Sequence, residues 1–70
     1  MERIYRELLE LKGLLRASKY SYKKIAQSIG IHTTTFSDKI NGYSTFTLSE
    51  ADKIIKLLNI SVEEISKYFF

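Results

Sequence analysis

The sequence contains no cysteine, no proline, one histidine and only three glycines in 70 residues. Without cysteine it forms no disulfide, and one histidine does not make a structural zinc site. The lack of proline and the scarcity of glycine leave little that opposes helix formation. A chain this short buries only about 60% of its unfolded surface, so residues 1–70 form a single domain with one small core. Because 44% of the residues are hydrophobic, we predict an all-α fold held together by apolar packing.

Several function classes are disfavoured by what the chain lacks. No apolar run approaches the roughly 18 residues of a membrane span, and charged residues begin at Glu2, so neither a membrane segment nor a signal peptide is predicted. No nucleophile, base or ligand cluster can be assembled from the sequence. We therefore expect a cytoplasmic protein that is not an enzyme and takes no metal, cofactor or small-molecule substrate.

Charge is unevenly distributed along the chain, whose net charge is +3. No acidic residue occurs from Leu11 to Ser37. The basic residues of this window are Lys12, Arg16, Lys19, Lys23 and Lys24. One side of the fold should be electropositive, which suits a nucleic-acid partner, although charge alone is equally typical of a solvated lysine-rich face.

Apolar periodicity predicts the first two helices. Leu8, Leu11 and Leu15 belong to an amphipathic stripe that predicts a helix from Glu2 to about Ala17. Ser21 is a suitable N-cap for a second helix that begins at Tyr22. We expect that helix to end at Gly30, since glycine readily adopts the left-handed conformation at helix ends.

The next segment predicts a short third helix from Thr33 to Ile40, ended by Asn41-Gly42. Phe36 and Ile40, one turn apart, form its apolar face. Three consecutive threonines make it weak by propensity, so tertiary contacts must hold it.

Two capping-box patterns predict the last two helices. Thr47-Leu-Ser-Glu50, with Phe46 before it, opens a fourth helix that extends to Asn59. Ser61-Val-Glu-Glu64 repeats the pattern and opens a fifth helix toward Tyr68. The chain is thus expected to have five helices with short connections.

The segment from Ser21 to Gly42 resembles the helix-turn-helix of the lambda-repressor and Cro-like (XRE-type) family. The resemblance rests on a small residue, a turn glycine, a buried aromatic and an Asn-Gly exit, which are Ala26, Gly30, Phe36 and Asn41-Gly42. It extends over about residues 3 to 66, with the helix-turn-helix at about 22–41, and is greatest to small regulators of phages and prophages of Gram-positive bacteria. It implies a five-helix, lambda-repressor-like domain that binds double-stranded DNA and regulates transcription, with the recognition helix in the major groove.

The resemblance assigns the base contacts to the exposed start of the recognition helix. The candidate base contacts are Thr33, Thr34, Ser37 and Asp38. Threonine can donate, accept, or present a methyl group to thymine. Asp38 has two open interpretations, acceptance of a hydrogen bond from cytosine N4 or repulsion of phosphate at wrong sites.

Phosphate contacts are expected from both helices. Lys23 and Lys24 oppose the dipole of the second helix unless an anion lies there, which favours phosphate. The other candidate phosphate contacts are Arg16, Lys19, Tyr22, His32, Asn41, Gly42 and Tyr43.

Two positions depart from the family pattern. Tyr22 stands where the family often has a phosphate-bonding glutamine, so recognition there must be built differently. Lys39 and Ile40 replace a usual apolar-then-polar order, so the recognition helix is rotated slightly or docks through Ile40.

The C-terminal aromatic residues predict self-association. Tyr68, Phe69 and Phe70 exceed what a small core absorbs, and we expect them to form the interface of a homodimer. The alternative is that they fold back over the first helix. The rival to DNA binding is a protein-interaction module, such as an antirepressor or antitoxin-like partner, that keeps the fold but does not bind DNA.

Overall fold

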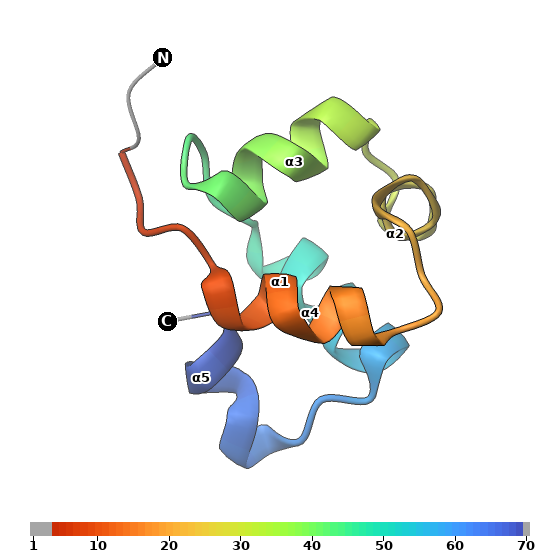
Figure 1. Cartoon of the computed structure of the whole chain (residues 1–70), viewed down its shortest axis with the longest axis vertical. Helices are drawn as coiled ribbons and strands as arrows, with labels where there is room; N and C mark the ends of the chain where they lie inside the picture. Colours follow the sequence, from red (N-terminus) through yellow and green to blue (C-terminus); the bar gives the residue numbers. More distant parts are fainter. Residues whose placement is uncertain (1–3, 70) are drawn as a thin grey trace.

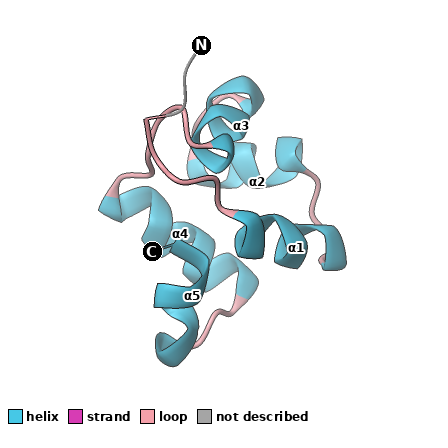
Figure 2. Ribbon diagram, turned by 60° about the vertical axis from the view of Figure 1, so that its left-hand side comes forward, coloured by secondary structure: helices cyan, strands magenta, loops and turns pink. Residues whose placement is uncertain are grey.

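The computed structural model describes residues 4–69, and in that range it has helices and no strand (Figure 1). The elements, in chain order, are α1 (Leu9–Ala17), α2 (Tyr22–Ile29), α3 (Thr33–Asn41), α4 (Leu48–Leu58), the 3-10 turn η1 (Val62–Glu64) and α5 (Ile65–Phe69). Short loops join them, and α2 and α3 lie side by side (Figure 2). The predicted all-α, five-helix fold is confirmed.

The start of the first helix was predicted wrongly. The expected helix ran from Glu2 to about Ala17, but α1 begins at Leu9. Residues 4–8, here called the N-terminal arm, are not helical, and Glu2 itself lies outside the described residues. The C-terminal end of α1 agrees with the prediction.

Hydrogen bonds to α3 explain why the arm is not helical. The N–H groups of Ile4 and Tyr5 donate to the carbonyl oxygen of Gly42, at 3.0 and 2.8 Å, and the N–H of Leu8 donates to that of Ile40 at 3.0 Å. The last carbonyls of a helix have no partner within it, so the arm supplies what α3 lacks. Ile4 is four residues before Leu8 and so continues the helical apolar spacing. It is nevertheless 76% exposed, so a helix here would gain nothing from burying it.

Gly42 is the residue that lets the arm approach α3 closely. It is buried, and its φ of +92° lies in the left-handed region. A Cβ atom at this position would lie 2.4 Å from the carbonyl oxygen of Tyr5. Both the backbone conformation and the available space therefore require glycine.

The second helix and its turn follow the prediction closely. The Ser21 hydroxyl oxygen accepts a hydrogen bond from the N–H of Lys24 at 3.1 Å, which caps α2. Gly30 adopts φ +83° at its other end, and the N–H of Ile31 donates to the Ala26 carbonyl at 3.0 Å. This Schellman-type ending turns the chain from α2 into α3.

The core is one apolar cluster to which α1 to α4 all contribute. Its largest fully buried side chains are Phe36, Leu11, Ile25, Ile40 and Ile54. Ala26 is also fully buried, as expected for a small residue where α2 and α3 meet. Of α3, the core buries Phe36 and Ile40, the two residues that the sequence assigned to its apolar face.

A row of aromatic rings connects α3 to the rest of the protein. The Phe36 ring lies with its centroid 5.2 Å from that of Tyr22 on α2 and 5.6 Å from that of Phe46, just before α4. The Phe46 ring in turn lies 6.1 Å from that of Phe69 on α5. Edge-on and tilted aromatic pairs at these separations each stabilise a fold by about 0.5–1.5 kcal/mol beyond their burial.

The two capping boxes differ in outcome. At Thr47 the predicted box is present, with Thr47 and Glu50 each accepting the other's backbone N–H. At Ser61 the box is absent, because the Ser61 hydroxyl donates to the Glu64 carboxylate at 3.0 Å and does not cap the backbone. The chain there forms the 3-10 turn first, and α5 begins only at Ile65.

The contact between the arm and α3 can be measured by comparing two glycines. Gly42→Ala and Gly30→Ala both place alanine in the left-handed region, which costs roughly 1–2 kcal/mol. Nothing lies within 4 Å of a Cβ at Gly30, whereas the arm blocks one at Gly42. We expect Gly42→Ala to lower the melting temperature clearly more, at about 4–8 °C per kcal/mol. Equal losses in thermal melts would contradict the arm contact.

Candidate nucleic-acid interface

The outer edge of α3 carries the candidate base contacts. Phe36 and Ile40 face the core, and Thr33 and Thr34 are exposed in the first turn. Ser37 and Asp38 are half-buried further along the same helix. In Figure 1 the helix runs along the edge of the molecule, and its exposed Thr33 and Thr34 are accessible to a large partner. The contacts of these four residues with bases stay predictions.

A hydrogen bond within α3 brings two candidate residues together. The Asn41 side-chain nitrogen donates to the Ser37 hydroxyl oxygen at 3.3 Å. The pair places an amide and a hydroxyl group one turn apart, where Ser37 was predicted to contact a base and Asn41 a phosphate. A base or phosphate oxygen approaching this edge therefore meets two linked polar groups.

His32, a candidate phosphate contact, occupies the N-cap of α3 and is exposed. Its side chain makes no capping hydrogen bond with the first turn. The N–H groups at the start of a helix carry partial positive charge and suit an anion. His32 and the adjacent backbone therefore provide a reasonable surface for a phosphate.

The four basic candidates lie on the chain between the last turn of α1 and the first turn of α2. Arg16 is in the last turn of α1, Lys19 in the connecting loop, and Lys23 and Lys24 in the first turn of α2. All four are exposed, and the first turn of α2 contains no acidic residue. This surface, here called the basic surface, has no neutralising acid from its own segment.

Three candidate phosphate contacts have structural roles inside the protein. The Tyr22 ring is half-buried against Phe36. The backbone N–H groups of Gly42 and Tyr43 both donate to the carbonyl of Asp38, where they cap the end of α3. The backbone donors of Gly42 and Tyr43 thus have partners inside the protein, and the half-buried Asn41 keeps a side-chain donor, which bonds to Ser37.

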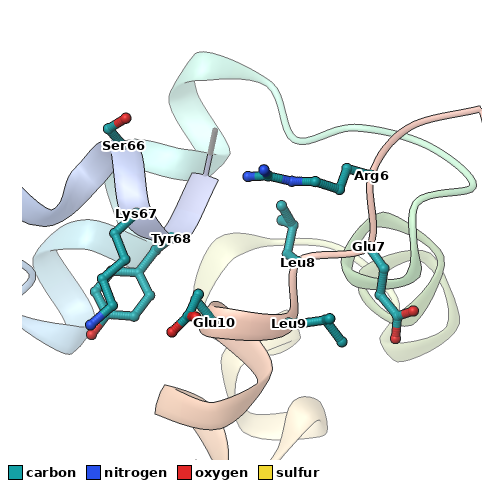
Figure 3. Close-up of a pocket in the computed structure, with 8 residues that line it drawn as sticks. All are labelled: Arg6, Glu7, Leu8, Leu9, Glu10, Ser66, Lys67 and Tyr68. Carbon is teal, nitrogen blue, oxygen red and sulfur yellow. The ribbon is translucent and has the colours of Figure 1, made fainter.

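The C-terminal aromatics pack on the protein's own core. Tyr68 and Phe69 are half-buried, and both contact the apolar cluster. Tyr68 also lines a hollow of about 430 Å³ between α5 and the start of α1, with Leu9 and Arg6 among its other walls (Figure 3). Phe70 lies outside the described residues. Tyr68 and Phe69 therefore fold back onto the protein, Tyr68 beside the start of α1 and Phe69 against Phe46, and each keeps some exposed surface.

An ion pair that the sequence did not predict joins α3 to α4. The Lys39 ammonium group lies 2.5 Å from Glu50 Oε1, and the side chains are only 11% and 14% exposed. The sequence flagged Lys39 as a departure from the family pattern and Glu50 as a capping residue, but nothing in the periodicity paired them. Ile40 is fully buried, so α3 docks through Ile40 as one of the two alternatives proposed.

Within residues 4–69, no helix is long and apolar enough to cross a bilayer. The same residues contain no cluster of three or more His, Asp or Glu side chains that would hold a metal ion.

A short helix that is fixed by one apolar edge, exposed on the other and preceded by a basic helix and a tight glycine turn defines a helix-turn-helix DNA-binding domain. Residues 10–70 match the model of the Cro/C1-type HTH DNA-binding domain, and the chain belongs to this family. The family is defined by DNA binding and not by a catalysed reaction. Searches of curated proteins and of solved structures found no significant match.

The ion pair predicts a specific pH dependence of stability. Partial burial on its own raises the pKa of Glu50, but hydrogen bonds from Lys39 and Thr47 and the Lys39 charge outweigh it and hold the pKa below its ordinary value of 4.5. The folded state therefore binds this proton less readily than the unfolded state, and the pair stabilises the fold above pH 4.5 and stops doing so as the pH falls through the lowered pKa.

The measurement compares Glu50→Gln with the parent protein. Glutamine keeps the capping acceptor but leaves Lys39 half-enclosed without a counter-charge, so the variant should melt lower at neutral pH. The difference between the two melting temperatures should shrink as the pH is lowered from about 5 to about 3, because the parent then loses the same charge. A difference that stays constant over this range would show that the charge of Glu50 does not stabilise the fold.

Proposed function

We propose that this protein is a small transcriptional regulator of the phage or prophage Cro/repressor type that binds specific double-stranded DNA in the cytoplasm. Membership of the Cro/C1-type family supports sequence-specific DNA binding by a regulator. The observation that carries the proposal is the division of α3 into a buried edge, Phe36 and Ile40, and an exposed edge that begins with Thr33 and Thr34. In this proposal α3 enters the major groove with its exposed edge toward the bases.

Base contacts supply the smaller part of the affinity in this proposal. Thr33, Thr34 and Ser37 are short side chains, and none makes the bidentate contacts that arginine, glutamine or asparagine make with base edges. A good bidentate pair contributes about 1–3 kcal/mol of discrimination. Specificity therefore comes from several modest contacts, with Asp38 either accepting from cytosine or excluding wrong sites.

Phosphate contacts supply most of the binding energy in this proposal. The basic surface carries four exposed charges with no acid in its own segment, which supports this assignment. The proposed phosphate contacts are Arg16, Lys19, Lys23, Lys24, His32 and the Asn41 side chain. Tyr22 and Tyr43 stay proposed phosphate contacts through their side-chain hydroxyl groups. Gly42, whose one donor is already bonded to the Asp38 carbonyl, is proposed only to lie next to the DNA backbone.

We also propose that the regulator binds as a homodimer. One short helix contacts only a few base pairs, so useful specificity needs two half-sites about 34 Å apart. Support comes from the hollow lined by Tyr68 and Leu9, and from the arm residues Ile4 and Tyr5, which also leave apolar surface exposed. The proposed interface is therefore α5 together with the arm and the start of α1.

The division between phosphate and base contacts is tested with two single variants. Lys23→Ala should weaken binding to a selected site and to random duplex alike, and should flatten the salt dependence by about 0.9 log unit per log unit of salt. Thr34→Ala should weaken the selected site and leave random duplex nearly unchanged. The measurement is a salt titration of both variants on both duplexes, with the site taken from selection on a random pool.

An unchanged salt slope for Lys23→Ala would show that the basic surface does not contact DNA. Equal losses of affinity on both duplexes for Thr34→Ala would show that the outer edge of α3 does not recognise bases. If the parent protein binds no duplex even at low salt, the proposal falls, and the interaction-module alternative takes its place.

The dimer interface is tested by placing a charge on it. Leu9 is 67% exposed and lines the hollow, whereas Val62 is 81% exposed and does not, which makes Val62→Glu a matched control for Leu9→Glu. Leu9→Glu should shift the protein toward monomer in sedimentation and weaken binding to a duplex with two half-sites more than to one with a single half-site. Identical behaviour of the two variants would exclude this interface.

A further inference from the structure

Lys39 is the one basic residue of α3, and its ammonium group lies against α4 and not on the exposed edge of the helix. Its side chain is 11% exposed, its ammonium group contacts Glu50 Oε1, and the same nitrogen lies 5.9 Å from the centroid of the Phe46 ring. A carboxylate on one side and an aromatic face on the other are both favourable neighbours for a cation. The lysine that would otherwise be the obvious phosphate contact of α3 is thus bound inside the protein.

Glu50 is held in place by hydrogen bonds of its own, independently of Lys39. Its Oε1 atom accepts the N–H of Thr47 at 3.0 Å, and its own N–H donates to the Thr47 hydroxyl oxygen at 3.1 Å. These two bonds fix the carboxylate against the first turn of α4. Lys39 therefore binds to an acceptor that is fixed on α4, and the ion pair fixes the position of α3 relative to α4.

The ion pair acts where the apolar contacts of α3 leave it free to rotate. Phe36 and Ile40 lie along one edge of the helix and anchor that edge in the core, but a single apolar edge resists rolling about the helix axis only weakly. Side-chain ends lie about 5–6 Å from that axis, so a roll of about 20° moves them by about 2 Å. Hydrogen bonds tolerate only a few tenths of an ångström, so base contacts depend on this angle.

We propose that Lys39 and Glu50 are positioning residues for base recognition: their ion pair fixes the rotation of α3 and thereby aims Thr34 and Ser37 at the base edges. The inference rests on the proposed function, in which α3 is the helix that contacts the bases. Neither residue touches DNA in this account. A buried ion pair adds little net stability compared with an apolar pair, and its contribution here is a defined geometry.

Glu50→Gln distinguishes positioning from simple electrostatics because the two give opposite signs. The change removes an acid and raises the net charge of +3 by one unit, which on its own strengthens binding to any duplex. Positioning instead predicts weaker binding to the selected site. The matched control is Asp52→Asn, which removes one acid from the same helix by breaking the exposed pair with Lys56, whose side chains are 76% and 58% exposed.

The measurement is the ratio of affinities for the selected site and for random duplex, determined below the melting range of every variant. Partial unfolding lowers both affinities equally, so the ratio reports geometry and not stability. We expect Glu50→Gln and Lys39→Met to lower the ratio by at least about fivefold each, the low end of the cost of one mismatched base pair, and the double variant to lower it no further. Lys39→Arg, which keeps the ion pair, should retain most of the parent's affinity ratio, and Asp52→Asn should leave the ratio unchanged.

Three results would overturn the inference. An unchanged or higher ratio for Glu50→Gln would show that the pair does not orient α3. A loss on both duplexes for Lys39→Met, with a salt slope flattened by about one unit, would make Lys39 a phosphate contact instead. A ratio that falls as far for Asp52→Asn as for Glu50→Gln would show that the effect comes from the charge on α4.

A parent protein with no preferred duplex would refute the proposed function, whereas a preference that survives Glu50→Gln refutes this inference alone.

Discussion

Phe36 lies fully buried between the rings of Tyr22 and Phe46, and the position of α3 depends on this contact. A nine-residue helix that begins with three threonines is not stable by itself in water. Its existence therefore depends on the apolar surface that α1, α2 and the segment before α4 provide. The same contact connects α2 to α4 through one aromatic row, so the helix-turn-helix and the supporting helices form one structural unit.

The two ends of α3 are treated differently by the fold. At its C-terminal end, the carbonyls receive N–H groups from the arm and from Gly42 and Tyr43, and the Lys39 charge is taken up by Glu50. At its N-terminal end, His32 adds no side-chain cap. Polar groups are thus satisfied internally at one end and left for solvent or a ligand at the other. Contacts with an anion are favoured near the turn that joins α2 to α3.

Features set by local chemistry were predictable from the sequence, and features set by distant partners were not. The Ser21 cap, the Gly30 turn and the Thr47 capping box each involve neighbouring residues. The arm was missed because its spacing suits a helix, while carbonyls more than thirty positions away decide its conformation. The Lys39–Glu50 pair joins two helices, and periodicity within one helix says nothing about it. The base, phosphate and dimer contacts stay predictions, since they depend on molecules outside the chain.

The separation of the two edges of α3 makes this domain a practical scaffold for retargeting. Because Phe36, Ile40 and Lys39 hold the helix from one side, the exposed positions 33 and 34 and the half-buried position 37 all lie outside the buried core. A library randomised at those three positions would vary base preference on a helix whose placement is inherited from the rest of the chain. New binding specificities would then come from chemical variety at the surface, without redesign of the interior.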